Sequence, residues 1–520
     1  MKIEYIGHAC LLIDTGKMKI ATDPWFHGPA YCGQWRIFPK PVNAAALNHI
    51  DVIALSHGHE DHLHVPSLEQ IRGDKTVFFP YLWYGGTKEY LQSLGFSKVT
   101  EAVPYKSYRV DGETTITYST NSLDSIIVIE NKGEVLVNVN DALHSSSAGA
   151  INHFIETIRG RWPRIDYLFC GYGGASYFPN CFHVPGKEDL TIGRLREQFF
   201  AHNFCLIVSR LKPKIAAPFA ADFALLSPAQ RWINDVRFPR PLMRRYYERN
   251  FGRDAGVGEV EITDMYPGDA LDGLQLNAAS PYRAVMNGGS LGHLIDEQYA
   301  EEISALKNPV WLAERQVEEL RARILKNVSE RAAIFGATTR GRLNRIVFSV
   351  RVNDVAEMNC FNVAFRGDQA SVERRAEPVS ESLLVVDTNS RIMNYSFDSE
   401  WGGEALGIGY GCEVRIADRE TVSAELDRAC FQLLHRLPVF KSHMLRSPLR
   451  AMRVLMAEKA MRRRAVGAVY RSGADTPEAT YGKQWLLESA DRIRENCQLP
   501  LFDVETASRE RARVASPNNK

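Results

Sequence analysis

The chain has 520 residues, of which 45% are hydrophobic and 24% are charged, and its net charge is +1. A single hydrophobic core stops growing at roughly 250–300 residues, so this length predicts at least two domains. The near-zero net charge excludes a global positive field of the kind that collects nucleic acid or an acidic membrane surface. Any recognition of an anion must therefore be local.

The cysteines and the N-terminus bear on the compartment. Nine cysteines, an odd number, are scattered from Cys10 to Cys497 without a CxxC pair, which favours reduced thiols. Residues 1–6 alternate like a strand and carry an acid early, unlike a signal peptide. No run reaches the roughly 18 apolar residues of a membrane-spanning helix. We therefore expect a cytoplasmic protein.

The first half of the chain predicts a mixture of strands and helices. Strands are expected where apolar residues alternate or form short runs, at 3–6, 10–13, 18–21, 50–56, 76–79, 115–118, 125–130, 134–139, 167–171 and 214–217. Helical patterns cover 66–71, 87–94 and 189–211. This mixture fits an αββα sandwich of the α/β class, with a domain over residues 1–280.

Beyond a small-residue linker at 277–290, the pattern changes. Helical periodicity runs over 296–332 with a break at Asn308-Pro309, and we assign 281–340 to a helical linker region. Later strands are expected at 345–352, 360–366, 370–375, 382–387 and 407–416, and helices at 422–434 and 449–464. These elements predict a smaller α+β C-terminal domain over 341–505, and the polar residues 506–520 predict a disordered tail.

A dense set of metal-ligand side chains follows the strand predicted at 50–56. The segment Ser56-His57-Gly58-His59-Glu60-Asp61-His62 holds three imidazoles and a carboxylate that suits the same ions. His57 and His59 can point to one side of an extended loop, while Asp61 and His62 begin the next turn. That spacing suits two neighbouring metal ions. The alternative is a histidine-rich surface loop.

His57 to His62 matches the HxHxDH signature, so the N-terminal domain resembles the metallo-β-lactamase superfamily. The flanking segments Ile6–Cys10 and Ala21–Pro24 are similar to the opening hairpin of its lactonase and phospholipase branch. The resemblance implies that His57 and His59 hold one metal ion and that Asp61 and His62 hold the second. It also implies that Asp141, after the strand at 134–139, bridges the two.

Two histidines that the resemblance leads us to expect are absent. One should fall within 119–122, and the other should follow 215–217, where the chain has Pro218-Phe219. The candidates that could complete the metal shells are His8, Asn121, His144, His183 and Asp222. His144 is preferred because it lies three residues past Asp141. The alternative is a hydrogen-bonding role for His8 and ordinary loop positions for His144 and His183.

The loss of two imidazoles shifts the site toward oxygen ligands. About two histidines with one or two carboxylates resemble a non-haem iron site for O₂ chemistry at least as much as a dizinc hydrolase. A single metal ion with an open position could still acidify water for hydrolysis. We expect one or two divalent ions, with iron favoured and zinc or manganese as alternatives.

The segments 173–179 and 212–220 resemble CMP-N-acetylneuraminate hydroxylases. This resemblance implies hydroxylation of an N-acyl group on a nucleotide-linked sugar, with electrons from a Rieske iron-sulfur centre. A Rieske cluster needs Cys-x-His and Cys-x-x-His, and only Cys181-Phe182-His183 supplies one half. Either a separate ferredoxin or reductase donates the electrons, or the reaction is not an oxygenation.

Three weaker signals remain. The glycine-rich residues 171–175 form a tight turn or approach an anion, and Tyr172, Ser176 and Tyr177 are candidates to line a pocket. Residues 441–471 carry nine basic residues against one acid, which fits a solvated helix face, an anionic ligand, an acidic redox partner or a membrane surface. The C-terminal domain resembles a sterol-carrier-like module with an apolar tunnel, or it serves packing or dimerisation.

We therefore expect a metal-dependent oxygenase acting on a polar small molecule, either nucleotide- or carrier-linked, with no nucleic-acid partner. The expected metal ligands are His57, His59, Asp61, His62, Asp141 and His144, and the expected catalytic residues are Asp61, Asp141 and Tyr177. One alternative is a hydrolase of a phosphodiester, lactone or amide, in which Asp61 or Asp141 orients the nucleophile. The other is a metal-bound scaffold without catalysis.

Overall fold

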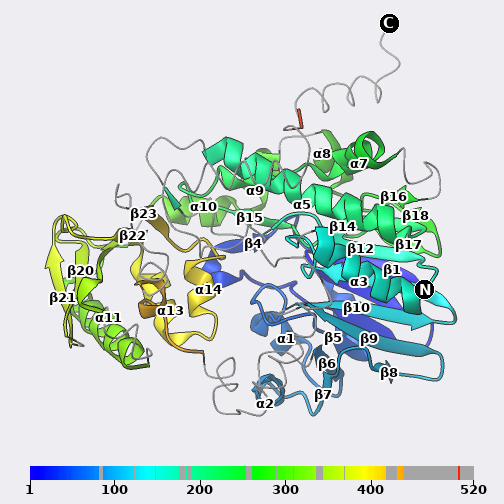
Figure 1. Ribbon diagram of the computed structural model, residues 1–520, viewed down its shortest axis with the longest axis horizontal. Coiled ribbons are helices and arrows are strands. Elements are labelled where there is room, and N and C mark those ends of the chain that lie inside the picture. The colour runs from blue at the N-terminus through cyan, green and yellow to red at the C-terminus, as the bar shows by residue number, and fades with distance from the viewer. Residues whose placement is uncertain are drawn as a thin grey trace, which may run out of the picture.

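The structure is a computed structural model of the chain. It describes residues 1–80, 86–121, 124–146, 148–174, 182–183, 189–252, 260–288, 291–308, 310–334, 343–367, 369–416, 430–438 and 502–503. Three sheets of six or more strands organise these residues (Figure 1).

The first sheet has eight strands in the order β18-β17-β1-β2-β3-β5-β6-β7. The strands are β1 (Lys2–Gly7), β2 (Cys10–Asp14), β3 (Lys19–Thr22), β5 (Val52–Ala54), β6 (Thr76–Pro80), β7 (Lys98–Ala102), β17 (Ala270–Asp272) and β18 (Gln275–Asn277). β1 to β3 form the expected antiparallel hairpins, whereas β3, β5, β6 and β7 run parallel. β17 returns to this sheet beside β1, and β18 pairs with β17, so residues 270–277 extend the sheet next to the N-terminal strand.

The second sheet has seven strands in the order β16-β14-β12-β11-β10-β9-β8. The strands are β8 (Ser107–Arg109), β9 (Thr114–Asn121), β10 (Asp124–Asn131), β11 (Glu134–Asn140), β12 (Tyr167–Gly171), β14 (Ile215–Phe219) and β16 (Glu261–Ile262). β9, β10 and β11 are antiparallel neighbours, and β11, β12 and β14 are parallel. The carboxyl ends of β11, β12 and β14 therefore meet at one edge.

The two sheets face each other across one apolar core. Ile3, Leu11 and Val52 from the first sheet share this core with Ile127 and Leu136 from the second, all with no exposed surface. Alternate residues of each strand point outward, where helices cover them. α1 (Val65–Gln70) and α2 (Thr87–Ser93) cover the first sheet, and α3 (Ala148–Arg161), α5 (Asp189–Leu211) and α7 (Met243–Phe251) cover the second. The αββα sandwich is thus confirmed (Figure 1).

Shorter elements close the sandwich. A small sheet pairs β4 (Trp35–Ile37) with β15 (Phe223–Leu225) beside the turn η1 (Tyr31–Gly33), and the turn η2 (Ala44–His49) precedes β5. Further short helices among the described residues up to 306 are α6 (Ile233–Val236), η3 (Arg240–Leu242), α8 (Arg283–Gly288), α9 (Leu291–Gln298) and α10 (Ala300–Leu306). α8 lies within the stretch that we expected to be a linker. The apolar core under α9 is contacted by Tyr282, Val285 and Met286. This tertiary burial stabilises α8, although the local composition predicted a linker.

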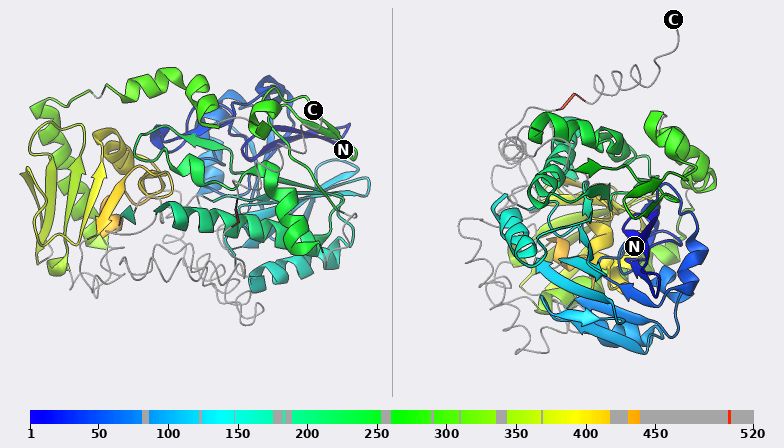
Figure 2. Two further views of the ribbon diagram at one scale, coloured as in Figure 1. Left: turned by 90° about the horizontal axis from the view of Figure 1, so that it is seen from above. Right: turned by 90° about the vertical axis from the view of Figure 1, so that its right-hand side faces the viewer.

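The third sheet, with its helices, lies at the far end of the molecule from the N-terminus (Figures 1 and 2). Its order is β13-β23-β22-β19-β20-β21, from β13 (Phe182–His183), β19 (Val347–Val352), β20 (Cys360–Arg366), β21 (Gln369–Arg375), β22 (Leu384–Thr388) and β23 (Glu413–Ile416). The helical elements are α11 (Glu314–Ile334), η4 (Leu343–Arg345), α13 (Ser390–Asp398) and α14 (Gly402–Leu406). Only 413–416 of the strand expected at 407–416 is a strand, because Gly407 to Gly411 form a turn against α14.

One continuous core joins the third sheet to the sandwich. Val350 and Val386 of the third sheet belong to the same buried cluster as Tyr31, Trp35 and Phe223 of the sandwich. α13 and α14 lie between the two (Figure 1). The domain limits 1–280, 281–340 and 341–505 stay our proposal, as does the sterol-carrier-like character of the last domain. None of the described helices combines the length and apolar character that a membrane span requires.

Candidate metal centre

The site forms where several strands of the sandwich end together. The loop after β5 carries His57 to His62, and Asp141 follows β11 directly. His8 lies in the tight turn between β1 and β2, and Asp23 follows β3. His8 (φ 50°) and Asp23 (φ 33°) hold backbone conformations that L-residues rarely adopt, and such strain persists where surrounding structure enforces it, often at functional sites.

Among the residues that the structure describes, three groups of side chains bring ligand atoms within 4.8 Å of one another. Each group contains two imidazoles and one carboxylate. The groups are His57, His59 and Asp124; His57, His62 and Asp141; and His8, Asp61 and His62. Because His57 and His62 are shared, the groups form one continuous cluster rather than three separate sites. Five of the six expected ligands belong to it.

Asp124 is a member that the sequence analysis missed. It opens β10 and pairs across the hairpin with Asn121 at the end of β9. Its Oδ1 lies 3.7 Å from His57 Nε2. Asn121, its cross-strand partner, lies in the stretch 119–122 where the expected histidine was absent. A carboxylate at the start of a predicted strand was the available signal, and only the hairpin pairing shows that it reaches the cluster.

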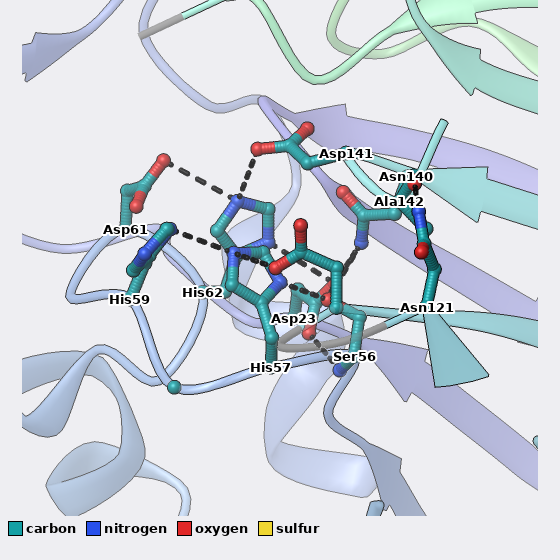
Figure 3. Close-up of polar contacts among 12 residues, drawn as sticks. Asp23, Ser56, His57, His59, Asp61, His62, Asn121, Asn140, Asp141 and Ala142 are labelled. Atoms are coloured by element: carbon teal, nitrogen blue, oxygen red, sulfur yellow. Dashed lines mark hydrogen bonds and ion pairs between the residues drawn. The ribbon is translucent and has the colours of Figure 1, made fainter. Parts of the chain in front are cut away.

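His62 occupies the middle of the cluster between Asp61 and Asp141 (Figure 3). Its Nε2 lies 3.3 Å from Asp61 Oδ2 and 3.4 Å from Asp141 Oδ2. His8 approaches from the other side, with Nε2 3.0 Å from the same Asp61 oxygen. His8 therefore contacts a predicted ligand directly, as both the ligand and the hydrogen-bonding interpretations require.

Residues behind the imidazoles fix their orientation. Ser56 Oγ lies 2.8 Å from His57 Nδ1 and donates to Asp23 Oδ2 at 2.7 Å. Asp23 Oδ2 also lies 3.2 Å from His62 Nδ1, and Asn140 donates to the same oxygen (Figure 3). Metal-binding histidines commonly engage their second nitrogen in this way, which leaves the other free for the ion. In both His57 and His62, Nε2 is the nitrogen that faces the cluster.

Charges in the cluster oppose one another strongly. Burial acts to lower the pKa of His62, but Asp61, Asp141 and Asp23 outweigh it and raise that pKa well above its usual value. Burial acts to raise the pKa of Asp61, but His62 and His8 hold it well below its usual range. Burial also raises the pKa of Asp124 to about 6. Without an ion, protons on imidazoles must balance these buried carboxylates.

The donor atoms fit a metal ion. Asp124 Oδ1 and Asp141 Oδ1 are buried and accept no hydrogen bond from the residues that the structure describes. Leaving a buried polar group without a partner costs about 1–3 kcal/mol, and more for a charged group. A divalent cation would give both oxygens a partner and would replace the protons that keep the imidazoles charged. Nitrogen and oxygen donors of this kind suit iron, zinc and manganese.

Other expected site residues lie elsewhere. His144 belongs to none of the three groups, and its Nδ1 contacts the carbonyl oxygen of Asp141. Asn121 donates to the Ala142 carbonyl and to Ser146 Oγ, so it braces the loop after Asp141. Asp222 forms a buried ion pair with Arg240 instead of entering the cluster.

The glycine-rich turn is described only in part. Tyr172 is buried near Arg240, whose guanidinium carbon lies 5.4 Å from the centre of its ring. Ser176, Tyr177 and the basic segment 441–471 fall outside the described residues. His183 belongs to β13, the edge strand of the third sheet.

Comparison with known proteins supports the resemblance. Residues 2–149 match the Beta-lactamase superfamily domain. The cytidine monophosphate-N-acetylneuraminic acid hydroxylase of Danio rerio is 28% identical over 255 residues, which cover 45% of this chain and 40% of the relative. A protein of Mycolicibacterium smegmatis named as a Rieske 2Fe-2S iron-sulfur protein is 24% identical over 61% of this chain and 62% of its own length. The chain thus spans about half the length of these relatives.

Solved structures with similar folds include hydroxylases and hydrolases. CmlA, a diiron β-hydroxylase from Streptomyces venezuelae, is 17% identical with a TM-score of 0.37, over 52% of this chain and 53% of its own. Igni18, a metallo hydrolase from Ignicoccus hospitalis, is 14% identical with a TM-score of 0.34, over 52% and 97%. These scores are too low to carry an argument about activity. The sequence match, the αββα fold and the HxHxDH loop agree that residues 2–149 form a Beta-lactamase superfamily domain.

Proposed function

We propose that the chain is a metal-dependent enzyme with two neighbouring ion positions. His57, His59 and Asp124 would hold one ion, and His8, Asp61 and His62 would hold the other. Asp141 would bridge them, because its carboxylate lies beside His62 and shares a group with His57. His144 would act behind Asp141, through the carbonyl contact, rather than as a ligand.

The composition of the donor groups favours oxygenation. Each group holds two imidazoles and one carboxylate, the ligand set with which non-haem iron proteins activate O₂ while keeping open positions. Iron would supply the one-electron chemistry that the protein side chains themselves lack. This composition is the observation on which the proposal depends. The hydroxylase of Danio rerio, 28% identical over 40% of its own length, is consistent with it.

The chain's own residues would prepare the site. Asp23 and Ser56 hold the imidazoles of His57 and His62 in one orientation, so little reorganisation is needed when an ion binds. Asp61 and Asp141 would be the catalytic carboxylates, and Tyr177 stays a candidate to line the pocket. The substrate would be a polar small molecule, either nucleotide- or carrier-linked, and a ferredoxin or reductase would donate electrons.

A hydrolase is the second candidate, because the same donor groups also occur around catalytic zinc. Two histidines and a carboxylate with an open fourth position hold zinc in several hydrolases. There the ion acidifies water, and Asp61 or Asp141 would orient the nucleophile. The substrate would then be a phosphodiester, a lactone or an amide.

Metal content and reactivity separate the two candidates. The protein would be purified without chelators, analysed for metals by mass spectrometry, and loaded anaerobically with iron(II) or with zinc(II). Iron retention with reductant-dependent O₂ uptake, lost in His57→Ala, supports the oxygenase. Zinc retention with turnover of bis(p-nitrophenyl) phosphate or simple lactones supports the hydrolase. Failure to retain any ion refutes both and leaves a non-catalytic scaffold.

A further inference from the structure

The loop that carries the ligands is contacted by helices of the C-terminal part of the chain. Tyr395 of α13 donates its hydroxyl proton to Glu60 Oε1 at 2.7 Å. Trp401, at the start of α14, donates from Nε1 to the carbonyl oxygen of Gly58 at 2.8 Å. Gly58 and Glu60 alternate with the ligands of the HxHxDH loop. These two hydrogen bonds therefore fix the two residues, Gly58 and Glu60, that separate the ligands.

Tyr31 completes the arrangement from the sandwich side. Its backbone N–H donates to Glu60 Oε2 at 2.8 Å, and its hydroxyl donates to Asp61 Oδ1 at 2.6 Å. Both oxygens of the Glu60 carboxylate are therefore engaged, one by Tyr31 and one by Tyr395. Asp61 Oδ1 is also engaged, which leaves Oδ2 as the oxygen that faces His8 and His62. The hydroxyl of Tyr31 thus selects which oxygen is presented to an ion.

The C-terminal part also packs tightly on Tyr31. Tyr31 has no exposed surface, and its ring lies 5.0 Å from that of Trp35. A Cβ added at Gly409 would lie 2.6 Å from Cβ of Tyr31, so the turn after α14 approaches it with no spare room. Movement of this turn would be transmitted to Tyr31, and through its hydroxyl to Asp61.

These contacts have a physical consequence for ion binding. Residues 55–64 of the loop lie outside helices and strands, and fixing such backbone costs conformational entropy. Side-chain hydrogen bonds can order the loop before an ion binds. Ion binding then loses less conformational entropy, so the affinity is higher. Partners behind metal ligands typically change affinity about 10- to 100-fold when they are removed.

We propose that Tyr395 and Trp401 are positioning residues of the metal centre, and that contact with α13 and α14 sets its affinity. Tyr31 transmits this contact to Asp61. The inference rests on the proposed function only in requiring that the cluster binds a divalent ion, and it holds for an oxygenase and for a hydrolase alike. A simple packing role is the alternative, in which the contacts stabilise the protein but leave ion affinity unchanged.

The test uses full-length variants that remove one donor and keep the ring: Tyr395→Phe, Trp401→Phe and Tyr31→Phe. Affinities for zinc(II) alone and for anaerobic iron(II) alone would be measured by competition with a chromophoric chelator. We expect about 10-fold weaker binding for each of these three variants, with a smaller rise in melting temperature on adding the ion. Tyr299→Phe is the control, because it loses a buried hydroxyl contact to the Ile37 carbonyl away from the loop.

The outcomes separate this inference from the proposed function. If wild type and Tyr299→Phe bind the ions equally while Tyr395→Phe and Trp401→Phe bind more weakly, the inference is supported. If the variants melt at lower temperature but bind with wild-type affinity, the helices serve packing and the inference is overturned, while the metal centre stands. If wild-type protein binds neither ion, both the proposed function and the inference are refuted.

Discussion

Asp124 offers the sharpest test of the metal centre, because its substitution has opposite effects with and without an ion. Its Oδ1 is buried without a hydrogen bond from the described residues and lies 3.7 Å from His57 Nε2. Burial raises the pKa of Asp124 from 3.8 to about 6, so removing its charge in Asp124→Asn should stabilise the metal-free protein at pH 7, by up to about 3 kcal/mol. The same change should weaken binding of one ion by more than about 100-fold, since it removes a ligand rather than a supporting partner.

The two effects need separate assays. Denaturant unfolding in the presence of a chelator measures the first, and metal stoichiometry after equilibrium dialysis against a buffered ion measures the second. Glu130→Gln is a matched control on the same strand, because Glu130 lies far along β10 from the cluster and accepts from Trp162 Nε1. If Asp124→Asn kept two ions with wild-type affinity, the assignment of Asp124 as a ligand would be wrong.

Three further predictions concern the ion and two buried groups. Removing the ion with a chelator should lower the free energy of unfolding by about 4 kcal/mol relative to protein held at 1,000 times the dissociation constant, measured by denaturant titration; an unchanged value would contradict ion binding. Asp222→Ala should lower the free energy of unfolding by about 3–5 kcal/mol, because it removes the carboxylate that pairs with the buried guanidinium of Arg240. The metal stoichiometry should stay at the wild-type value. Loss of an ion in this variant would instead indicate that Asp222 is a ligand. Burial lowers the pKa of His202 from 6.5 to about 4, so the unfolded state binds its proton more readily and stability falls as the pH drops from 6.5 toward 4. At pH 5 the loss of unfolding free energy amounts to about 2 kcal/mol. His202→Phe should abolish this loss when chelator-treated proteins are unfolded at pH 7.5 and at pH 5. An equal loss in wild type and variant would refute the prediction.

The sequence by itself determined the sandwich and the centre of the site. Apolar alternation placed strands such as β10 and β11 correctly, because one face of each strand must be buried. The imidazoles and carboxylate of residues 57–62 follow one another along a short loop, so their proximity required no knowledge of the rest of the fold. Asp141 could be added from its position directly after a strand.

Only the tertiary structure decided which distant residues join that loop. Asp124 and His8 reach the cluster because hairpins from two different sheets end at the same edge, and strand order is not encoded in local periodicity. The helices α13 and α14 were not expected, because short helices draw their stability from packing rather than from local propensity. Their contacts with Gly58 and Glu60 span more than 300 residues of chain. No local pattern could have shown that helices of the C-terminal part of the chain contact the loop of residues 57–62.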